Sequence, residues 1–551
     1  MKKIFYFLFL VLVASCSGPS NDLTSFSINN VAATINGISI TVTLPVGTNV
    51  TSLSPIIEIS EGATVSPASG VAQDFSKPVI YTVTGANKEA KDFVVMVITG
   101  AAPVVSNLCT SSTHPTTTFE SGSGVATDPY IICTPTQLNL IGALNEDPNY
   151  DYPLLNKYYK LGTNLDMSST PYNPIGNITS TLKGFTGSFD GNGKTISGLN
   201  IGSTGSFIAF IPYLAPGGLV RDLGLSITVT GSSYYTAGLV AYGVSGTILN
   251  SYVIGTIQGQ SETGGLMGHG TYMNITGCYS TANVTGSSSV GGLIGSTDSP
   301  SFVTNSYATG AVVGSGDHVG GLIGSSQSVV LSCMATGNIS GVSYVGGLIG
   351  QVRSGTFASD TTNSYATGSV TASGNLTGGL VGELGADSNI FSSYSTGPVL
   401  NTGGGYTGGL VGNNDGYSII DSYSTSSVNS SGDFIGGFVG QHSANAHFIQ
   451  NCYSIGSVTG SSVSLGGFIG LDLSQGNCSR CYWNTETSGQ GSSACGDGKT
   501  TEEMTAQPTE MYDGWDFDYA WSFDKSKCSS YPSTPSPYLY PCLRIYSLGL
   551  D

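Results

Sequence analysis

Two pairs of acidic residues are the groups in this sequence that could most readily do chemistry. Glu383 with Asp387, and Asp415 with Asp421, could supply the two carboxyl groups that a glycosidase places a few ångströms apart. Neither pair recurs within a supporting motif, and isolated surface acids account for both. We therefore expect no catalytic residue in this chain.

Basic and metal-binding residues are also scarce. A lyase acting on uronates needs Lys or Arg beside its acidic substrate, but the stretch from Gly202 to Asn477 holds no Lys and only Arg221 and Arg353. None of the five histidines is followed by Glu, so the His-Glu-x-x-His zinc motif is absent. We expect no metal and no cofactor.

A column of tyrosines is the recurring feature with binding chemistry. Motifs such as NSYATG place one Tyr in each repeat, with Met334 in its place once. Apolar residues of the same strand parity favour rings that point into a core. The alternating Ser and Cys favour the opposite, an outward aromatic stripe for sugars, because Cys is often buried. Both interpretations stay open for the candidate ligand-facing ladder of Tyr252, Tyr279, Tyr307, Tyr365, Tyr394, Tyr423 and Tyr453.

An internal repeat must position these residues. A Gly-Gly-apolar-apolar-Gly anchor recurs with a period of about 28 residues, after a degenerate copy that begins at Ala237. The full anchors begin at Gly264, Gly291, Gly320, Gly346, Gly378, Gly408, Gly436 and Gly466.

Strand-like runs at this period predict an all-β chain containing a three-sided parallel β-helix of about nine coils. Two inward ladders should form, one of Val or Ile from Ile257 to Val458 and one of Leu or Phe from Leu266 to Phe468. Glycine should provide positive φ at corners and close stacking of coils. Bonds from coil to coil at a bend are expected of Asn250, Asn305, Asn363 and Asn451.

The two motifs, recurring in fixed order over about 245 residues, resemble the GLUG repeat. The resemblance implies a bacterial surface protein or adhesin that meets a host or environmental ligand. GLUG repeats also flank IgA-cleaving metallopeptidases, but the missing zinc motif excludes that activity here.

The segments on either side of the array resemble the usual flanks of such repeats, as in TPTQLNLIGALN (134–145) and CYWNTETSGQ (481–490). A β-helix exposes unpaired strand edges at its ends. We therefore expect an N-terminal cap at 129–200, a GLUG-repeat solenoid at 201–482 and a C-terminal cap at 483–551.

Residues 23–100 form a separate unit of short alternating strands. Asn36-Gly37 favours a hairpin turn between two of them. The stretch 51–85 resembles an immunoglobulin-like domain common near the N-termini of exported bacterial lipoproteins, which implies a small β-sandwich that acts as a spacer. Residues 101–128, rich in Ser, Thr, Pro and Gly, are typical of a linker.

The N-terminus has the pattern of an export leader. A basic start precedes ten apolar residues, a run too short to span a bilayer. Val13-Ala14-Ser15-Cys16 resembles a bacterial lipobox, which implies a signal peptide at 1–15 and a tether at 16–22 whose Cys16 carries diacylglycerol. Ser17 lacks the Asp that retains many lipoproteins in an inner membrane, so the outer membrane or cell surface is favoured.

The composition excludes one class of binding partner, nucleic acids. The chain has 551 residues, 79 of them Gly, with 9% charged residues and a net charge of −18, so it lacks the basic surface that nucleic-acid binding requires. Ten cysteines besides Cys16 suit an oxidising compartment. Disulfides are expected within three groups whose pairing stays open: Cys109 with Cys133; Cys478, Cys481 and Cys495; and Cys528 with Cys542.

We therefore expect a lipid-anchored bacterial surface protein that displays a repetitive solenoid for adhesion or ligand binding, with a glycan or a protein as ligand. Weak contacts in each coil would add up through avidity. The alternative is a carbohydrate-active enzyme, a polysaccharide hydrolase or lyase, on the same scaffold.

The variant Cys16→Ala tests the lipid anchor. Because the diacylglycerol then has no thiol to bond to, we expect the protein to leave the membrane fraction for the soluble fraction. Cell fractionation followed by immunoblotting measures this, with Ser17→Ala, which keeps the thiol, as control. Membrane-bound Cys16→Ala protein contradicts the prediction.

Overall fold

The computed structural model describes residues 22–29, 31–36, 39–44, 48–60, 62–75, 79–85, 90–99, 108–142, 154–176, 184–298, 300–355, 359–462, 464–474, 476–505, 511–517, 520–523 and 540–543. Cys16 and Cys528 lie outside them. The chain divides into two compact units, the first ending at Ala102 and the second beginning at Pro103.

The first unit consists of two small sheets, with alternating residues buried between them. One sheet has the order β2 (Val31–Ala32), β1 (Leu23–Ile28), β5 (Ile56–Ile59). The other has the order β3 (Thr34–Asn36), β4 (Ser39–Leu44), β8 (Ala90–Thr99), β7 (Val79–Thr84), β6 (Thr64–Ser66). Phe26, Tyr81 and Phe93 are at most 2% exposed and centre the core. Antiparallel pairing of β3 with β4 agrees with the predicted hairpin.

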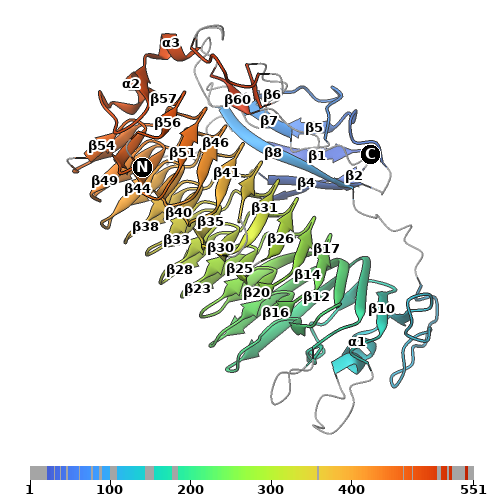
Figure 1. Cartoon of the computed structure of the whole chain (residues 1–551). Helices are drawn as coiled ribbons and strands as arrows, with labels where there is room; N and C mark the ends of the chain where they lie inside the picture. The colour runs from blue at the N-terminus through green and yellow to red at the C-terminus, as the bar shows by residue number, and fades with distance from the viewer. Residues whose placement is uncertain are drawn as a thin grey trace, which may run out of the picture. The chain divides into compact units, whose positions relative to one another are not determined.

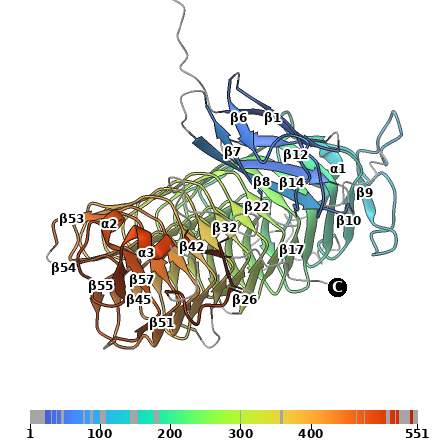
Figure 2. The same ribbon diagram turned by 90° about the horizontal axis from the view of Figure 1, so that it is seen from above.

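The second unit is a parallel β-solenoid, which confirms the predicted fold class (Figures 1 and 2). It has about eleven turns rather than nine, because coils before Ala237 also stack on the array. The Leu and Val/Ile columns are buried as predicted, from Leu266 and Ile257 at 0% exposure to Phe468 at 0% and Val458 at 1%.

Three sets of strands build each turn. The first set forms a ten-stranded sheet of β13 (Ile211–Leu214), β16 (Val240–Val244), β20 (Met267–Thr271), β25 (Ile294–Asp298), β30 (Ile323–Ser326), β35 (Ile349–Val352), β40 (Val381–Leu384), β45 (Val411–Asn414), β50 (Val439–His442) and β55 (Ile469–Asp472). The second forms a nine-stranded sheet of β15 (Thr236–Ala237), β19 (Thr263–Gly264), β24 (Val290–Gly291), β29 (Val319–Gly320), β34 (Val345–Gly346), β39 (Thr377–Gly378), β44 (Tyr406–Gly408), β49 (Phe434–Gly436) and β54 (Ser464–Gly466).

The third set starts from the long strands β12 (Ser188–Ser203) and β14 (Leu219–Gly231) and continues as three short ladders. One ladder is β17 (Thr247–Leu249), β21 (Asn274–Thr276), β26 (Ser301–Thr304), β31 (Ser328–Leu331), β36 (Thr361–Thr362), β41 (Asn389–Phe391), β46 (Ser418–Ile420), β51 (Phe448–Gln450) and β56 (Cys478–Ser479). The tyrosine ladder is β18 (Tyr252–Gln258), β22 (Tyr279–Ser280), β27 (Tyr307–Ala308), β32 (Met334–Ala335), β37 (Tyr365–Ala366), β42 (Tyr394–Ser395), β47 (Tyr423–Ser424), β52 (Tyr453–Ser454) and β57 (Tyr482–Asn484). The last is β23 (Asn283–Gly286), β28 (Val312–Gly314), β33 (Ile339–Gly341), β38 (Val370–Ala372), β43 (Val399–Asn401), β48 (Val428–Ser430) and β53 (Val458–Gly460).

Short elements precede and follow the solenoid in the sequence. Before the first long strand come β9 (Tyr130–Ile132), α1 (Pro135–Gly142), β10 (Tyr158–Leu161) and β11 (Leu165–Asp166). After the last turn come α2 (Thr485–Ser488), β58 (Asp497–Lys499), α3 (Thr501–Thr505), β59 (Trp521–Ser522) and β60 (Cys542–Leu543). No helix among the described residues is long and apolar enough to cross a membrane.

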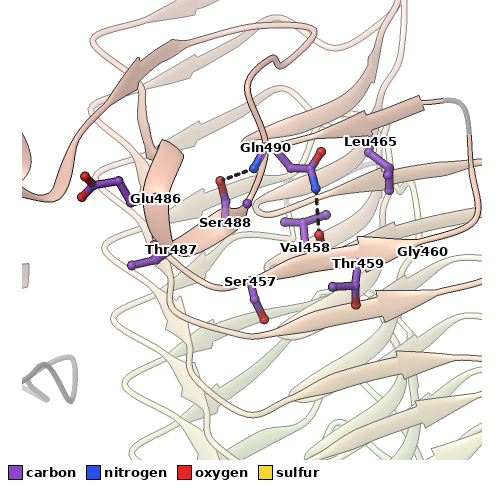
Figure 3. A pocket seen from close by; sticks show the side chains of 10 residues that line it. Ser457, Val458, Thr459, Gly460, Leu465, Glu486, Thr487, Ser488 and Gln490 are labelled. Carbon is purple, nitrogen blue, oxygen red and sulfur yellow. Dashed lines mark hydrogen bonds between the residues drawn. The ribbon is translucent and has the colours of Figure 1, made fainter.

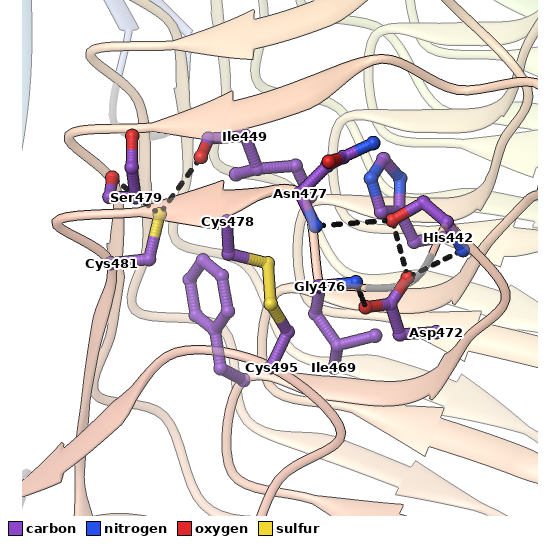
Figure 4. Close-up of a disulfide and its surroundings, with 12 residues drawn as sticks. His442, Ile449, Ile469, Asp472, Gly476, Asn477, Cys478, Ser479, Cys481 and Cys495 are labelled. Atoms are coloured by element: carbon purple, nitrogen blue, oxygen red, sulfur yellow. Dashed lines mark hydrogen bonds between the residues drawn. A yellow bond between two sulfur atoms is a disulfide. The ribbon is translucent and has the colours of Figure 1, made fainter.

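A disulfide lies near each end of the second unit. Cys109 is bonded to Cys133 before α1, and Cys478, in β56 of the last turn, is bonded to Cys495 (Figure 4). Cys481, the third member of the second predicted group, stays a buried thiol whose Sγ lies 3.4 Å from the Ile449 carbonyl oxygen.

The anchor glycines are required by close approach and not by positive φ, which corrects part of the expectation. A Cβ on Gly320 would lie 2.0 Å from the Ile323 carbonyl oxygen, and one on Gly321 would lie 2.1 Å from the Gly347 carbonyl oxygen of the next coil. Other residue types take the positive φ at the corners. Asn250 has φ 46° and bonds to Asp222 of the preceding coil through its Nδ2, at 3.1 Å from Oδ1.

Gly320→Ala tests this packing. The added methyl group meets backbone that cannot rotate away, so we expect a loss of roughly 1–3 kcal/mol of stability. Thermal unfolding followed by circular dichroism measures it. Gly202→Ala is the matched control, since a Cβ there meets no atom within 4 Å. Equal melting temperatures for the two variants would contradict the account.

Candidate functional site

The predicted tyrosine ladder forms a stack of rings along the solenoid. In-register parallel pairing places Tyr279 between Tyr252 and Tyr307, with ring centroids 4.8 Å apart on either side. Tyr365 and Tyr394 are also 4.8 Å apart. This distance matches the spacing of neighbouring strands, so the backbone sets the stack and offset aromatic contact adds to it.

The tyrosine rings lie on the outer side of the coil, so the interpretation of inward rings is wrong. The residues that precede them, such as Ser251, Cys278 and Cys452, are fully buried, and both cysteines belong to the interior apolar cluster. Tyr423 and Tyr453 belong to a second cluster that they share with the C-terminal residues.

The C-terminal segment covers the later rings of the ladder. Trp521 Nε1 donates to Asp421 Oδ1 at 3.0 Å, and the Tyr453 hydroxyl donates to the Pro541 carbonyl at 2.7 Å. Three rings are at most 2% exposed: Tyr394, Tyr423 and Tyr453. The others are half-buried (Tyr252, Tyr279, Tyr365) or buried (Tyr307), and their contact with a ligand stays a prediction.

No described hydrogen bond links the two members of either acidic pair. Glu383 accepts a hydrogen bond from Gln351 Nε2 at 2.7 Å, whereas Asp387 is exposed at a corner. Asp415 accepts from the loop that carries Asn445, and Asp421 from the C-terminal segment. Glu383, Asp415 and Asp421 are therefore structural hydrogen-bond acceptors.

Side chains converge instead on a surface that we call the corner face. Each coil contributes two residues to it. One is the corner residue two positions before the first anchor residue, and the other is the strand residue five positions after that same anchor residue. The strand positions are in register from β16 to β45. The pairs are Tyr235 with Tyr242, Glu262 with His269, Ser289 with Ser296, His318 with Ser325, Tyr344 with Gln351, and Leu376 with Glu383.

Aromatic rings cluster at the first coils of the corner face. Tyr235 stacks on Phe207 with centroids 4.8 Å apart, and Tyr242 lies 5.5 Å from both Tyr235 and Tyr213. These four rings are half-buried, and the neighbouring Tyr234 is 58% exposed. The cluster therefore presents apolar ring surface at the protein boundary.

An ionic network continues this cluster into the next coils. The His269 ring stacks on Tyr242 at 5.3 Å and 17°. Its Nδ1 lies 2.6 Å from Glu262 Oε2 and its Nε2 lies 3.4 Å from Asp298 Oδ2. Arg353 Nη2 donates to Asp298 Oδ1 at 2.6 Å.

The network favours the charged forms of His269 and Asp298. Burial alone would lower the pKa of His269, but its bonds to Asp298 and Glu262 outweigh burial and raise that pKa to about 9. The bond from His269, together with Arg353, holds the pKa of Asp298 well below its usual range. The network thus balances two cations against two carboxylates, and its imidazole carries a proton at neutral pH.

This arrangement suits binding better than catalysis. A protonated imidazole held between two carboxylates has no lone pair to act as a base. The carboxylate oxygens accept hydrogen bonds, and the adjacent rings offer apolar faces. A ligand with hydroxyl groups on an otherwise apolar ring matches both features.

The sequence reasoning missed this site, although a signal exists. The two corner-face positions are those where residue type changes from coil to coil, with Tyr235, Glu262 and His318 at equivalent corners. Because these positions vary, they belong to neither of the two repeated motifs.

Two other clusters of residues do not form a binding site. A shallow depression beside α2 and β53 is lined by Glu486 and Gln490 (Figure 3). Gln490 Nε2 donates to the Val458 carbonyl at 2.8 Å, and Glu486 accepts a hydrogen bond from the Thr501 amide. His114 and Glu120 lie near Cys133, whose sulfur is in a disulfide and cannot ligate a metal as a thiolate.

Comparison with known families locates one match. Residues 23–97 match the family described as "SGBP, N-terminal", the N-terminal domain of surface glycan-binding proteins. The match lies within the first unit, and its family suggests a binding protein at the cell surface.

Similarity to individual proteins is partial. Halomucin of Haloquadratum walsbyi (strain DSM 16790 / HBSQ001) is 32% identical over 151 residues, which is 26% of this chain and 2% of halomucin. A proposed glycoside hydrolase of Bacteroides thetaiotaomicron is 34% identical over 15% of this chain and 27% of its own, with a TM-score of 0.15.

Two solved structures cover more of the chain. A proposed immunoglobulin A1 protease of Bacteroides ovatus is 16% identical and covers 77% of this chain and 95% of its own, with a TM-score of 0.26. An IgA1 protease is 15% identical over 80% of this chain and 29% of its own, with a TM-score of 0.29. None of these structures carries an argument about activity.

The ionic network predicts a pH dependence of stability. Because the pKa of His269 is about 9 in the folded chain and about 6.5 in an unfolded one, its contribution is complete below pH 6.5 and is lost as pH rises through 9. The loss should reach roughly 3 kcal/mol. Melting temperatures measured between pH 6 and 10 should fall more steeply for the native chain than for His269→Gln. Replacing the exposed His447 by Gln should leave the native slope, and a native slope in His269→Gln would contradict the assignment.

Proposed function

We propose that this chain is a surface glycan-binding protein that binds its glycan on the corner face of the solenoid. The observation that carries the proposal is the cluster of half-buried rings around Tyr235 and Tyr242, continued by the Glu262, His269 and Asp298 network. The family match at residues 23–97 supports the same class of ligand.

The chemistry of a sugar fits this surface. One face of a pyranose ring presents C–H groups that pack on aromatic rings, while its hydroxyls donate to carboxylates. Tyr234 and Tyr242 extend the apolar area toward solvent, and Asp298 keeps 41% of its side chain exposed for such bonds.

We also propose the route by which this face reaches its ligand. Lipidation at Cys16 would hold the chain on the outer membrane or cell surface, and residues 23–100 would act as a spacer. The GLUG-type repeats would then display the corner face to the surroundings. The Cys16→Ala fractionation described above tests the anchor separately from binding.

Tyr242→Ala tests the binding site. Loss of the ring removes the contact surface next to His269, so we expect at least a tenfold weaker affinity, about 1.4 kcal/mol. Affinity electrophoresis of the full chain in gels that contain a panel of neutral polysaccharides measures the change.

Phe302→Ala is the matched control, because Phe302 is 48% exposed on β26, outside the corner face. Equal retardation of the native chain and Tyr242→Ala would contradict the proposed site. Release of reducing ends from the retained polysaccharide would instead support the alternative, a carbohydrate-active enzyme.

A further inference from the structure

We infer that the glycan bound at the corner face is uncharged. This inference rests on the proposed function and names its ligand class. The evidence is that the positively charged side chains of the solenoid are few and are paired with carboxylates.

Cations are few along the solenoid. From Gly202 to Asn477 the sequence holds eleven acidic residues and no Lys, with Arg221 and Arg353 as its arginines. A ligand carboxylate or sulfate would need one of these arginines or a protonated His as its partner.

Among the residues that the structure describes, each cation beside the candidate site already has a carboxylate. Arg353 lies 2.6 Å from Asp298, and His269 lies 2.6 Å from Glu262 and 3.4 Å from Asp298. Arg221, elsewhere on the solenoid, lies 2.8 Å from Asp190. An anionic sugar would have to displace one of these carboxylates or share its cation, and sharing places two negative charges side by side.

The rest of the corner face adds negative charge and amides. Glu383 stands among Gln351 and Asn413, whose Nε2 and Nδ2 lie 2.7 Å and 3.3 Å from its two oxygens. Amides and carboxylates both exchange hydrogen bonds with hydroxyls, whereas carboxylates repel anions. The face therefore favours a neutral polymer of hydroxylated rings.

A matched set of ligands tests the inference on the full chain. The neutral polysaccharide that retards the chain most strongly is carboxymethylated at low density, and part of that product is converted to its methyl ester. The ester has nearly the same size without the charge. We expect the acid form to bind at least tenfold more weakly than the ester at low salt, with the difference shrinking as salt screens the charges.

Asp298→Asn provides the matched variant. It frees Arg353 from its carboxylate, so the ratio of ester to acid affinity should move toward one. Asp387→Asn makes the same change in net charge at an exposed corner outside the face and should keep the native ratio.

The outcomes separate the two proposals. Acid and ester binding equally well to the native chain, or acid binding better, overturns the neutral-ligand inference and leaves glycan binding intact. A native chain that no polysaccharide retards overturns the proposed function and this inference with it. A tenfold preference that Asp387→Asn abolishes and Asp298→Asn does not would also overturn the assignment of selectivity to the corner face.

Discussion

In-register stacking of parallel coils is the constraint on which the rest of this structure depends. Every residue faces its counterpart one strand spacing away, about 4.8 Å. Apolar columns and tyrosine rings gain from this repetition, as the 4.8 Å stack of Tyr252, Tyr279 and Tyr307 shows. Like charges at one position of every coil would destabilise the solenoid, because each would repel its counterpart in the next coil. The low charge of the chain and its paired anchor glycines follow from the same geometry.

The charged side chains of the corner face lie next to side chains of opposite charge. Glu262 and His269 come from one coil and Asp298 from the next, and Arg353 closes the network from two coils further on. Such a network is compatible with stacking because each carboxylate has a cation beside it. In the described part of the chain it also leaves no unpaired cation near the rings around Tyr242, and for this reason the site and its ligand preference are linked.

Much of the fold could be predicted from the sequence, because periodicity reports which residues share a column. Leu266 and Val458 were placed inside for that reason, and both are buried. Periodicity does not report which side of a strand is covered by a distant segment. The tyrosines were ambiguous because Trp521 and its neighbours, far along the chain, supply the apolar cover for their outer side. The corner face escaped notice because its members vary from coil to coil.

The central claim is that a neutral glycan lies on the corner face. A crystal structure of the full chain with the tightest-binding neutral oligosaccharide tests it most directly. The account predicts a sugar ring packed on Tyr235 or Tyr242, with hydroxyls bonded to Glu262 or Asp298. An oligosaccharide bound only to residues 23–97, or only along the tyrosine ladder, would contradict it.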